Sequence, residues 1–190
     1  IDVPDAALRA MTLGQLRRVV KHAQRRCKAE GWLGVRFPDG KMTYVRPTPS
    51  ALNLSDVSTH LTRPATHGHR LPGGDATKKP SFVELVADGP QRPDYFASHF
   101  WGEAVEDFVA CIAQHTRDRA YGGGRFITHK DHGTPPNQQP ADGDEAKVWV
   151  CAYANRQWSL AGDVTDDPSQ TSFHRAMRLA FGTIAIVDQS

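Results

Sequence analysis

The stretch Lys147-Val148-Trp149-Val150-Cys151-Ala152-Tyr153 decides the fold prediction. It is apolar almost throughout, and a continuous apolar run of this kind is typical of a strand buried on both faces of a parallel sheet. The elements expected around it are strands over 94–99 and 183–188, a helix over 104–119, and a helix that begins at Ser169 or Thr171. This alternation of strands and helices predicts an α/β fold with a three-layer parallel sheet.

Residues 1–80 precede this unit and are predicted to form a basic appendage. Thr12 is a good N-cap for an amphipathic helix over 13–30, which should stop at Gly31. The dipeptide Asp39-Gly40 between two β-rich runs predicts a hairpin. The expected organisation is a segment of helices, hairpin and irregular linker over 1–80, followed by an α/β domain over 81–190 with a loop insertion at 121–145.

The composition is that of a soluble globular protein. Of the 190 residues, 39% are hydrophobic and 23% are charged, so the chain can bury enough apolar surface to collapse. No run of about 18 apolar residues occurs, and we therefore expect no membrane-spanning helix. Three scattered cysteines do not make a disulfide framework and no secretory signal is visible, which favours a cytoplasmic location. Because the chain begins at Ile1 rather than at Met, we expect a processed product.

The net charge of +2 hides an asymmetry. Residues 1–50 contain ten Lys and Arg against four Asp and Glu, a balance of +6, and residues 51–190 contain thirteen against seventeen, a balance of −4. Clustered cations on one helix are a footprint of nucleic-acid binding. The predicted helix over 13–30 carries no Phe, Trp or Tyr, however, and the whole chain is nearly neutral. We therefore expect its basic face to be solvated or to dock on an acidic partner, and nucleic-acid binding is disfavoured. The basic residues concerned are Arg17, Arg18, Lys21, Arg25, Arg26 and Lys28.

A candidate site follows from the predicted sheet, because ligands of open α/β sheets bind beyond the carboxyl ends of the strands. The residues that follow the three strands there include Ser98, His99, Trp101, Glu103, Asn155, Gln157 and Asp188. They combine an imidazole, carboxylates, amides and an indole. The alternative is that Trp101 and Trp158 cap the core, while Asn155 and Gln157 satisfy the backbone of a loop. No metal site is expected, because the histidine pairs of the chain lack paired cysteines.

The same stretches resemble a TIR-like (Toll/interleukin-1 receptor-like) family of algal and protist type. Residues 95–103, Tyr-Phe-Ala-Ser-His-Phe-Trp-Gly-Glu, are similar to its (Y/W)FxSHxWGE motif, and residues 148–158 to its WVCAxANNQ motif. The resemblance covers residues 81–190 and implies a flavodoxin-like fold. Some TIR-like domains cleave the glycosidic bond of NAD, and others act by homotypic assembly. The Trp-Cys-x-x-Glu pattern of the NAD-cleaving members is absent. We therefore expect a fragment of a longer protein, or a sheet that a partner completes.

The resemblance also implies roles for the strand-end residues. Ser98, His99, Trp101 and Glu103 would border a nucleotide pocket, with Asn155 and Gln157 opposite them. An N-glycosidase needs a carboxylate that stabilises an oxocarbenium-like charge on the ribose. Glu103 is the motif carboxylate that could do this, and the alternative is that it caps the following helix.

Two functions from different classes remain open. The first is a TIR-like protein-interaction or assembly module, with a protein partner or a second copy of the chain as its partner. The second is an NAD-cleaving or other nucleotide-processing enzyme whose catalytic helix lies beyond residue 190. The sequence assigns no particular cofactor, and NAD enters as the substrate of the second function.

Overall fold

The computed structural model describes all residues except 72–77, 122–142, 161–162, 164, 166 and 188–190. The predicted insertion over 121–145 therefore lies largely outside the described residues, and so does Asp188.

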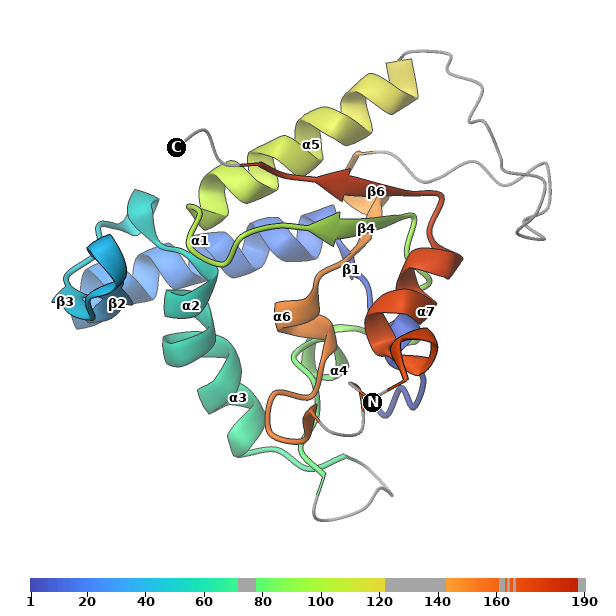
Figure 1. Ribbon diagram of the computed structural model, residues 1–190, viewed down its shortest axis with the longest axis horizontal. Helices are drawn as coiled ribbons and strands as arrows, with labels where there is room; N and C mark the ends of the chain where they lie inside the picture. The colour runs from blue at the N-terminus through green and yellow to red at the C-terminus, as the bar shows by residue number, and fades with distance from the viewer. Residues whose placement is uncertain (72–77, 122–142, 161–162, 164, 166, 188–190) are drawn as a thin grey trace.

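The fold is mixed α/β, built on a four-stranded sheet that is mostly parallel (Figure 1). Its strands are β1 (Met11–Thr12), β4 (Tyr95–Ser98), β5 (Lys147–Trp149) and β6 (Gly182–Ala185), in the spatial order β1-β5-β4-β6. β4 runs parallel to both β5 and β6, as the sequence predicts, whereas β1 runs antiparallel to β5. The registers pair Met11 with Val148 and Tyr95 with both Val148 and Gly182.

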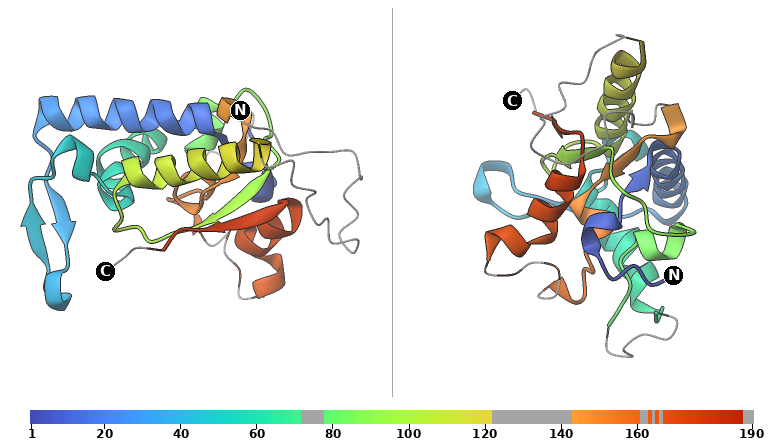
Figure 2. Two further views of the ribbon diagram at one scale, coloured as in Figure 1. Left: turned by 90° about the horizontal axis from the view of Figure 1, so that it is seen from above. Right: turned by 90° about the vertical axis from the view of Figure 1, so that its right-hand side faces the viewer.

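Helices cover both faces of this sheet (Figure 2). On one face, Tyr95 and Ala97 of β4 belong to a large apolar cluster with residues of α1 (Leu13–Glu30) and α5 (Val105–Tyr121). On the other face, Phe96 and Trp149 belong to a smaller cluster with residues of η1 (Ala6–Leu8) and α7 (Ser172–Leu179). Successive side chains of a strand point to opposite faces of the sheet, so Tyr95 and Ala97 lie on one face and Phe96 lies on the other.

The longest helix, α1, follows its sequence signals closely. The hydroxyl of Thr12 accepts a hydrogen bond from the N–H of Gln15 at 3.0 Å, and the Gln15 side chain accepts one from the N–H of Thr12 at 2.8 Å. This reciprocal capping box begins the helix. The helix ends at Gly31, whose φ of 62° lies in the left-handed region that suits glycine.

The remaining elements lie between and around these. They are β2 (Gly34–Arg36), η2 (Pro38–Gly40), β3 (Thr43–Val45), η3 (Pro49–Ala51), α2 (Leu54–Val57), the π-helical turn η4 (Ser58–Thr62), α3 (Arg63–His67), α4 (Val83–Val86), η6 (Gly143–Glu145), α6 (Cys151–Ala154) and η8 (Pro168–Gln170). Within the part of the chain that the structure describes, no helix combines the length and the apolar character needed to cross a membrane.

The predicted strand over 147–153 is wrong in its second half. β5 ends at Trp149, and the rest of the apolar run, from Cys151 to Ala154, forms the buried helical turn α6. A short apolar run cannot distinguish a buried strand from a buried helix, because neither shows an exposed side. The residues predicted to end the second strand, Asn155 and Gln157, therefore follow α6 instead of a strand.

The apolar run over 183–187 likewise predicts a buried strand, and this prediction is wrong. β6 forms one edge of the sheet, and of its four residues only Ile184 is buried. The antiparallel strand β1 was not predicted, because a strand of two residues leaves no period in the sequence.

Candidate functional site

His99 follows β4 directly and lies where the sequence predicts a site. Its ring packs against Phe108 of α5, with the ring centroids 4.7 Å apart. Both ring nitrogens are buried. Among the residues that the structure describes, neither nitrogen has a partner at hydrogen-bond distance and angle. Burial lowers the pKa of this imidazole below its ordinary value, and the nearby carbonyl of Ala97 opposes the shift. Burial therefore favours the neutral form of the His99 imidazole.

The neighbours of His99 in the motif lie in different environments. Ser98 ends β4 with an exposed side chain, and its carbonyl accepts a hydrogen bond from the N–H of Ile186 at 2.9 Å. Trp101 packs partly buried against the main core. Its side chain faces the thiol of Cys151, whose pKa is raised by burial although the hydrogen bond with Trp101 opposes the rise. Glu103 is partly buried just before α5 begins at Val105. The carboxyl ends of β4 and β5 therefore bring Trp101 and Cys151 together.

The hydrogen bonds of the two predicted amides go to neighbouring helices. Asn155 is buried, and its side-chain oxygen accepts a hydrogen bond from the hydroxyl of Ser172 at 2.8 Å. The side-chain nitrogen of Gln157 lies 3.4 Å from the carbonyl oxygens of both Cys151 and Ala152. These contacts join α6 to α7 and satisfy the carbonyls of α6.

A second candidate site is the hairpin formed by β2 and β3, which projects from the body near the end of α1 (Figure 2). The register pairs Val35 with Tyr44, so these two side chains lie on the same face. Leu33 and Phe37 flank the first strand and Met42 precedes the second, at positions that the alternation of side chains assigns to this face. We call these five residues the apolar hairpin face.

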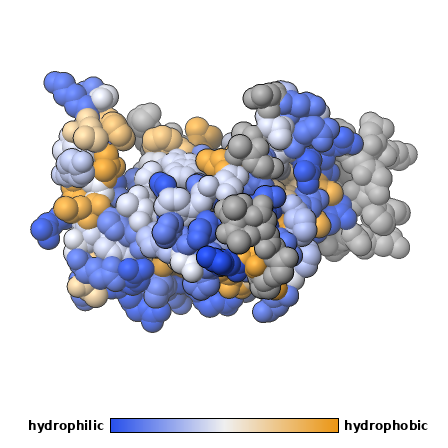
Figure 3. Space-filling model, turned by 90° about the horizontal axis from the view of Figure 1, so that it is seen from below, coloured by the Kyte–Doolittle hydropathy of each residue, from blue (hydrophilic) through white to orange (hydrophobic). Residues whose placement is uncertain are grey.

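The apolar hairpin face points to solvent. The exposed fraction is 65% for Phe37 and Tyr44, 60% for Met42 and 51% for Leu33. Figure 3 shows apolar atoms gathered at the end of the molecule where the hairpin lies.

The opposite face of the hairpin binds the body of the protein through polar groups. Arg36 forms a bidentate ion pair with the buried carboxylate of Asp56, with nitrogen–oxygen distances of 2.9 and 2.7 Å. Hydrogen bonding with Asp56 raises the pKa of Arg36, although burial opposes the rise. Gly34 lies so close to Asp56 that a Cβ atom there would sit 2.3 Å from its carboxylate oxygen. His60 adds a hydrogen bond to the carbonyl of Leu33 at 2.8 Å. These contacts fix which face of the hairpin is turned outward.

The sequence predicts the hairpin but not the orientation of its faces. The alternation of Leu33, Val35 and Phe37 is visible in the sequence and would ordinarily indicate a face that packs on the core. The orientation depends on Asp56, which lies 20 residues after Arg36 in the chain. A contact between residues 20 positions apart leaves no local pattern in the sequence.

No metal centre accompanies either site, because the described residues contain no group of three or more His, Cys, Asp or Glu side chains placed to hold an ion. Comparison with known proteins does not assign the chain to a group: no protein-family model matches it, and neither a curated protein nor a solved structure matches it.

Proposed function

We propose that the chain is a protein-interaction and assembly module, of TIR-like and flavodoxin-like type, that pairs through the apolar hairpin face. The observation that carries this proposal is that the hairpin turns its apolar face to solvent while its polar face holds the body. The mostly parallel sheet flanked by helices is compatible with a flavodoxin-like fold.

The energetics of the exposed face support an interface. Burying a large apolar side chain that was exposed to water contributes about 1.5–3 kcal/mol of favourable free energy. Four such side chains on one small hairpin are more than half exposed. Contiguous exposed apolar patches on globular proteins often mark interaction sites. The bidentate ion pair between Arg36 and Asp56 also holds the hairpin in a fixed orientation, which lowers the entropy cost of binding.

The partner that we favour is a second copy of the chain. Two identical apolar faces can pair about a twofold axis, which is the commonest symmetry of protein dimers. Aromatic residues and methionine are also enriched in interfaces, and this face supplies Phe37, Met42 and Tyr44.

Sedimentation velocity over a wide range of concentration tests this function. We expect the wild-type chain to associate reversibly and the double variant Phe37→Ser/Tyr44→Ser to associate at least about tenfold more weakly. The matched control is Val86→Ser/Met177→Ser, which removes two other exposed apolar side chains. It should associate as the wild type does. A wild-type chain that stays monomeric throughout, or a hairpin variant that still associates normally, contradicts the proposal.

The second candidate function, cleavage of NAD, is favoured by the buried imidazole of His99 at the carboxyl end of β4. In this function Glu103 stabilises charge on the ribose. Incubation with NAD should then release nicotinamide, and the variant Glu103→Gln should abolish the release. The matched control Glu106→Gln, which changes an exposed carboxylate in the first turn of α5, should leave it unchanged. Absence of release both from this chain and from a chain extended past Ser190 contradicts this candidate.

A further inference from the structure

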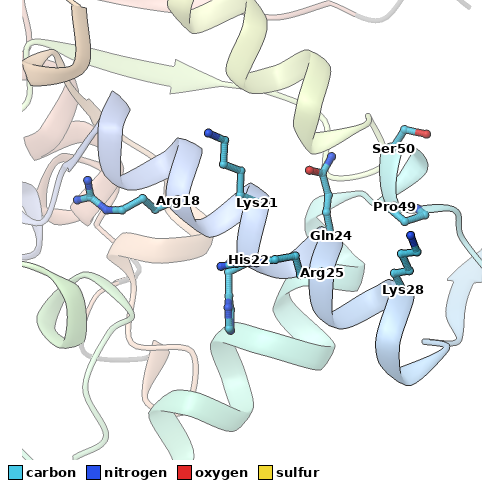
Figure 4. A pocket seen from close by; sticks show the side chains of 8 residues that line it. All are labelled: Arg18, Lys21, His22, Gln24, Arg25, Lys28, Pro49 and Ser50. Atoms are coloured by element: carbon cyan, nitrogen blue, oxygen red, sulfur yellow. The ribbon is translucent and has the colours of Figure 1, made fainter.

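We propose that the basic side of α1 is a binding site for an acidic helix of a partner protein. Arg18, Lys21, Arg25 and Lys28 are exposed along α1 and line an open groove with a volume of about 770 Å³. We call these four residues the α1 cation row. Pro49 and Ser50 form another part of the groove wall, and Figure 4 shows them near Lys28, at the opposite end of the row from Arg18. The proposal uses none of the hairpin residues, so it stands independently of the proposed assembly.

The spacing of the α1 cation row places its members on one side of the helix. The gaps between successive members are three, four and three residues. At 3.6 residues per turn, such gaps keep side chains within one face, and the row is about 15 Å long at a rise of 1.5 Å per residue. The apolar residues of α1 occupy the other side and are buried in the core.

None of the four cations forms an ion pair with any residue in the part of the chain that the structure describes. The other basic residues Arg17 and Arg26 of the same helix are paired, with Asp144 and Glu30 respectively. Each member of the row instead has another cation three or four residues away, and like charges at these spacings destabilise a helix. This repulsion within the row opposes folding, and an acidic ligand would relieve it.

An acidic helix has the geometry that matches this row. Glu residues at gaps of three, four and three residues on a partner helix would meet the four cations at the same axial spacing. Because this series of gaps reads the same in both directions, the two helices can pair in parallel or antiparallel orientation. Gln24 also lines the groove and can donate hydrogen bonds to carboxylates.

The surroundings of the row favour an acidic protein over nucleic acid. Among the described residues that line the groove, none is a Phe, Trp or Tyr on which a base could stack. Residues 51–190 carry a balance of −4, which would repel a phosphate backbone that extends past the row. A short acidic helix that ends with the row avoids this repulsion.

Fluorescence anisotropy with two labelled helical peptides of the length of α1 tests the inference. The first peptide carries four Glu at gaps of three, four and three residues, and the second carries the same Glu distributed around the helix. At low salt we expect the full chain to bind the first peptide at least about tenfold more tightly than the second, and added salt should weaken this binding.

Two variants with the same change in net charge distinguish an effect of the α1 cation row from an effect of net charge alone. Lys21→Glu/Arg25→Glu should lose at least about tenfold in affinity for the first peptide. It should instead bind a version of that peptide in which Lys replaces only the two middle Glu, which face positions 21 and 25. The control Lys78→Glu/Arg178→Glu changes the net charge equally at exposed positions outside α1 and should retain the affinity. Circular dichroism should show that both variants keep the helix content of the wild type, because Glu is a good helix former.

Four results would overturn the inference. They are no binding of the first peptide at low salt, equal affinity for the two peptides, equal loss in the two variants, and tighter binding of single-stranded DNA of the same charge than of the first peptide. The last result would assign the row to nucleic acid.

Discussion

Glu84 shows how single residues hold this molecule together. Its buried carboxylate accepts hydrogen bonds from the N–H groups of Val3 and Ser81, at 2.9 and 2.7 Å, and two from Arg156, at 3.1 and 2.6 Å. Burial alone would raise the pKa of Glu84. The hydrogen bonds from Arg156, Val3 and Ser81, together with the positive charge of Arg9, outweigh this effect. The pKa is therefore lowered from 4.5 to about 2. The carboxylate is therefore ionised in the folded protein well below the pH at which it would be protonated in the unfolded chain.

This shift predicts a loss of stability in acid. Because the folded pKa is the lower one, its contribution is fully present above pH 4.5 and disappears as the pH falls towards about 2. A shift of this size corresponds to about 3 kcal/mol of unfolding free energy. Urea denaturation of the wild type and of Glu84→Gln across this pH range should show the difference between them shrinking by that amount. The control Asp107→Asn, at an exposed carboxylate, should follow the wild type, and a pH-independent difference for Glu84→Gln would contradict the prediction.

At the scale of elements, α1 is specified by its own residues. Thr12→Ala removes the hydroxyl that accepts from Gln15 and opens the capping box. We expect a cost of about 1 kcal/mol in unfolding free energy, measured by urea denaturation at neutral pH. Thr183→Ala, at an exposed position of β6, is the matched control and should change the stability by less than about 0.5 kcal/mol. An equal effect of the two substitutions would show that the cap does not contribute.

The elements that the sequence predicts are those whose signals are local. The cap at Thr12, the stop at Gly31 and the turn at Asp39-Gly40 each depend on residues within one turn, and the structure confirms all three. The strand over 147–153 was half wrong because buried helices and buried strands have the same apolar composition. The exposure of β6 could not be predicted, since it depends on the position of the strand at the edge of the sheet.

The candidate sites also have some features that local sequence signals predict and others that depend on distant contacts. The position of Ser98 and His99 at the end of β4 follows from the strand itself and was predictable. The outward turn of the apolar hairpin face depends on the pairing of Arg36 with Asp56, and the pairing of Arg9 with Asp163 spans 154 residues. Polar contacts at such separations leave no period in the sequence, so they appear only when the chain is folded.

At the scale of the whole molecule, the core crosses the boundary at residue 80 that the composition suggests. β1 pairs with β5, and the buried side of α1 shares one apolar cluster with residues of β4, β5 and α5. The buried guanidinium of Arg9 adds hydrogen bonds to the carbonyl of Ala154 at 3.2 Å and to the carboxylate of Asp163 at 3.0 Å. The backbone nitrogen of Ile1 donates to the carbonyl of Glu84 at 3.0 Å.

These contacts predict that residues 1–80 and residues 81–190 unfold together. Residues 81–190 alone would expose the sheet face and the side of α5 that α1 covers, and would leave the Asp163 carboxylate without its Arg9 partner. Breaking a buried ion pair in this way costs about 3–5 kcal/mol. We expect the full chain to show a single urea transition that coincides in tryptophan fluorescence and circular dichroism. The segment 81–190 should show no cooperative transition by itself, and addition of the separate segment 1–80 should restore one. A cooperative transition of 81–190 alone, with the signal of the full chain, would instead make residues 1–80 a true appendage.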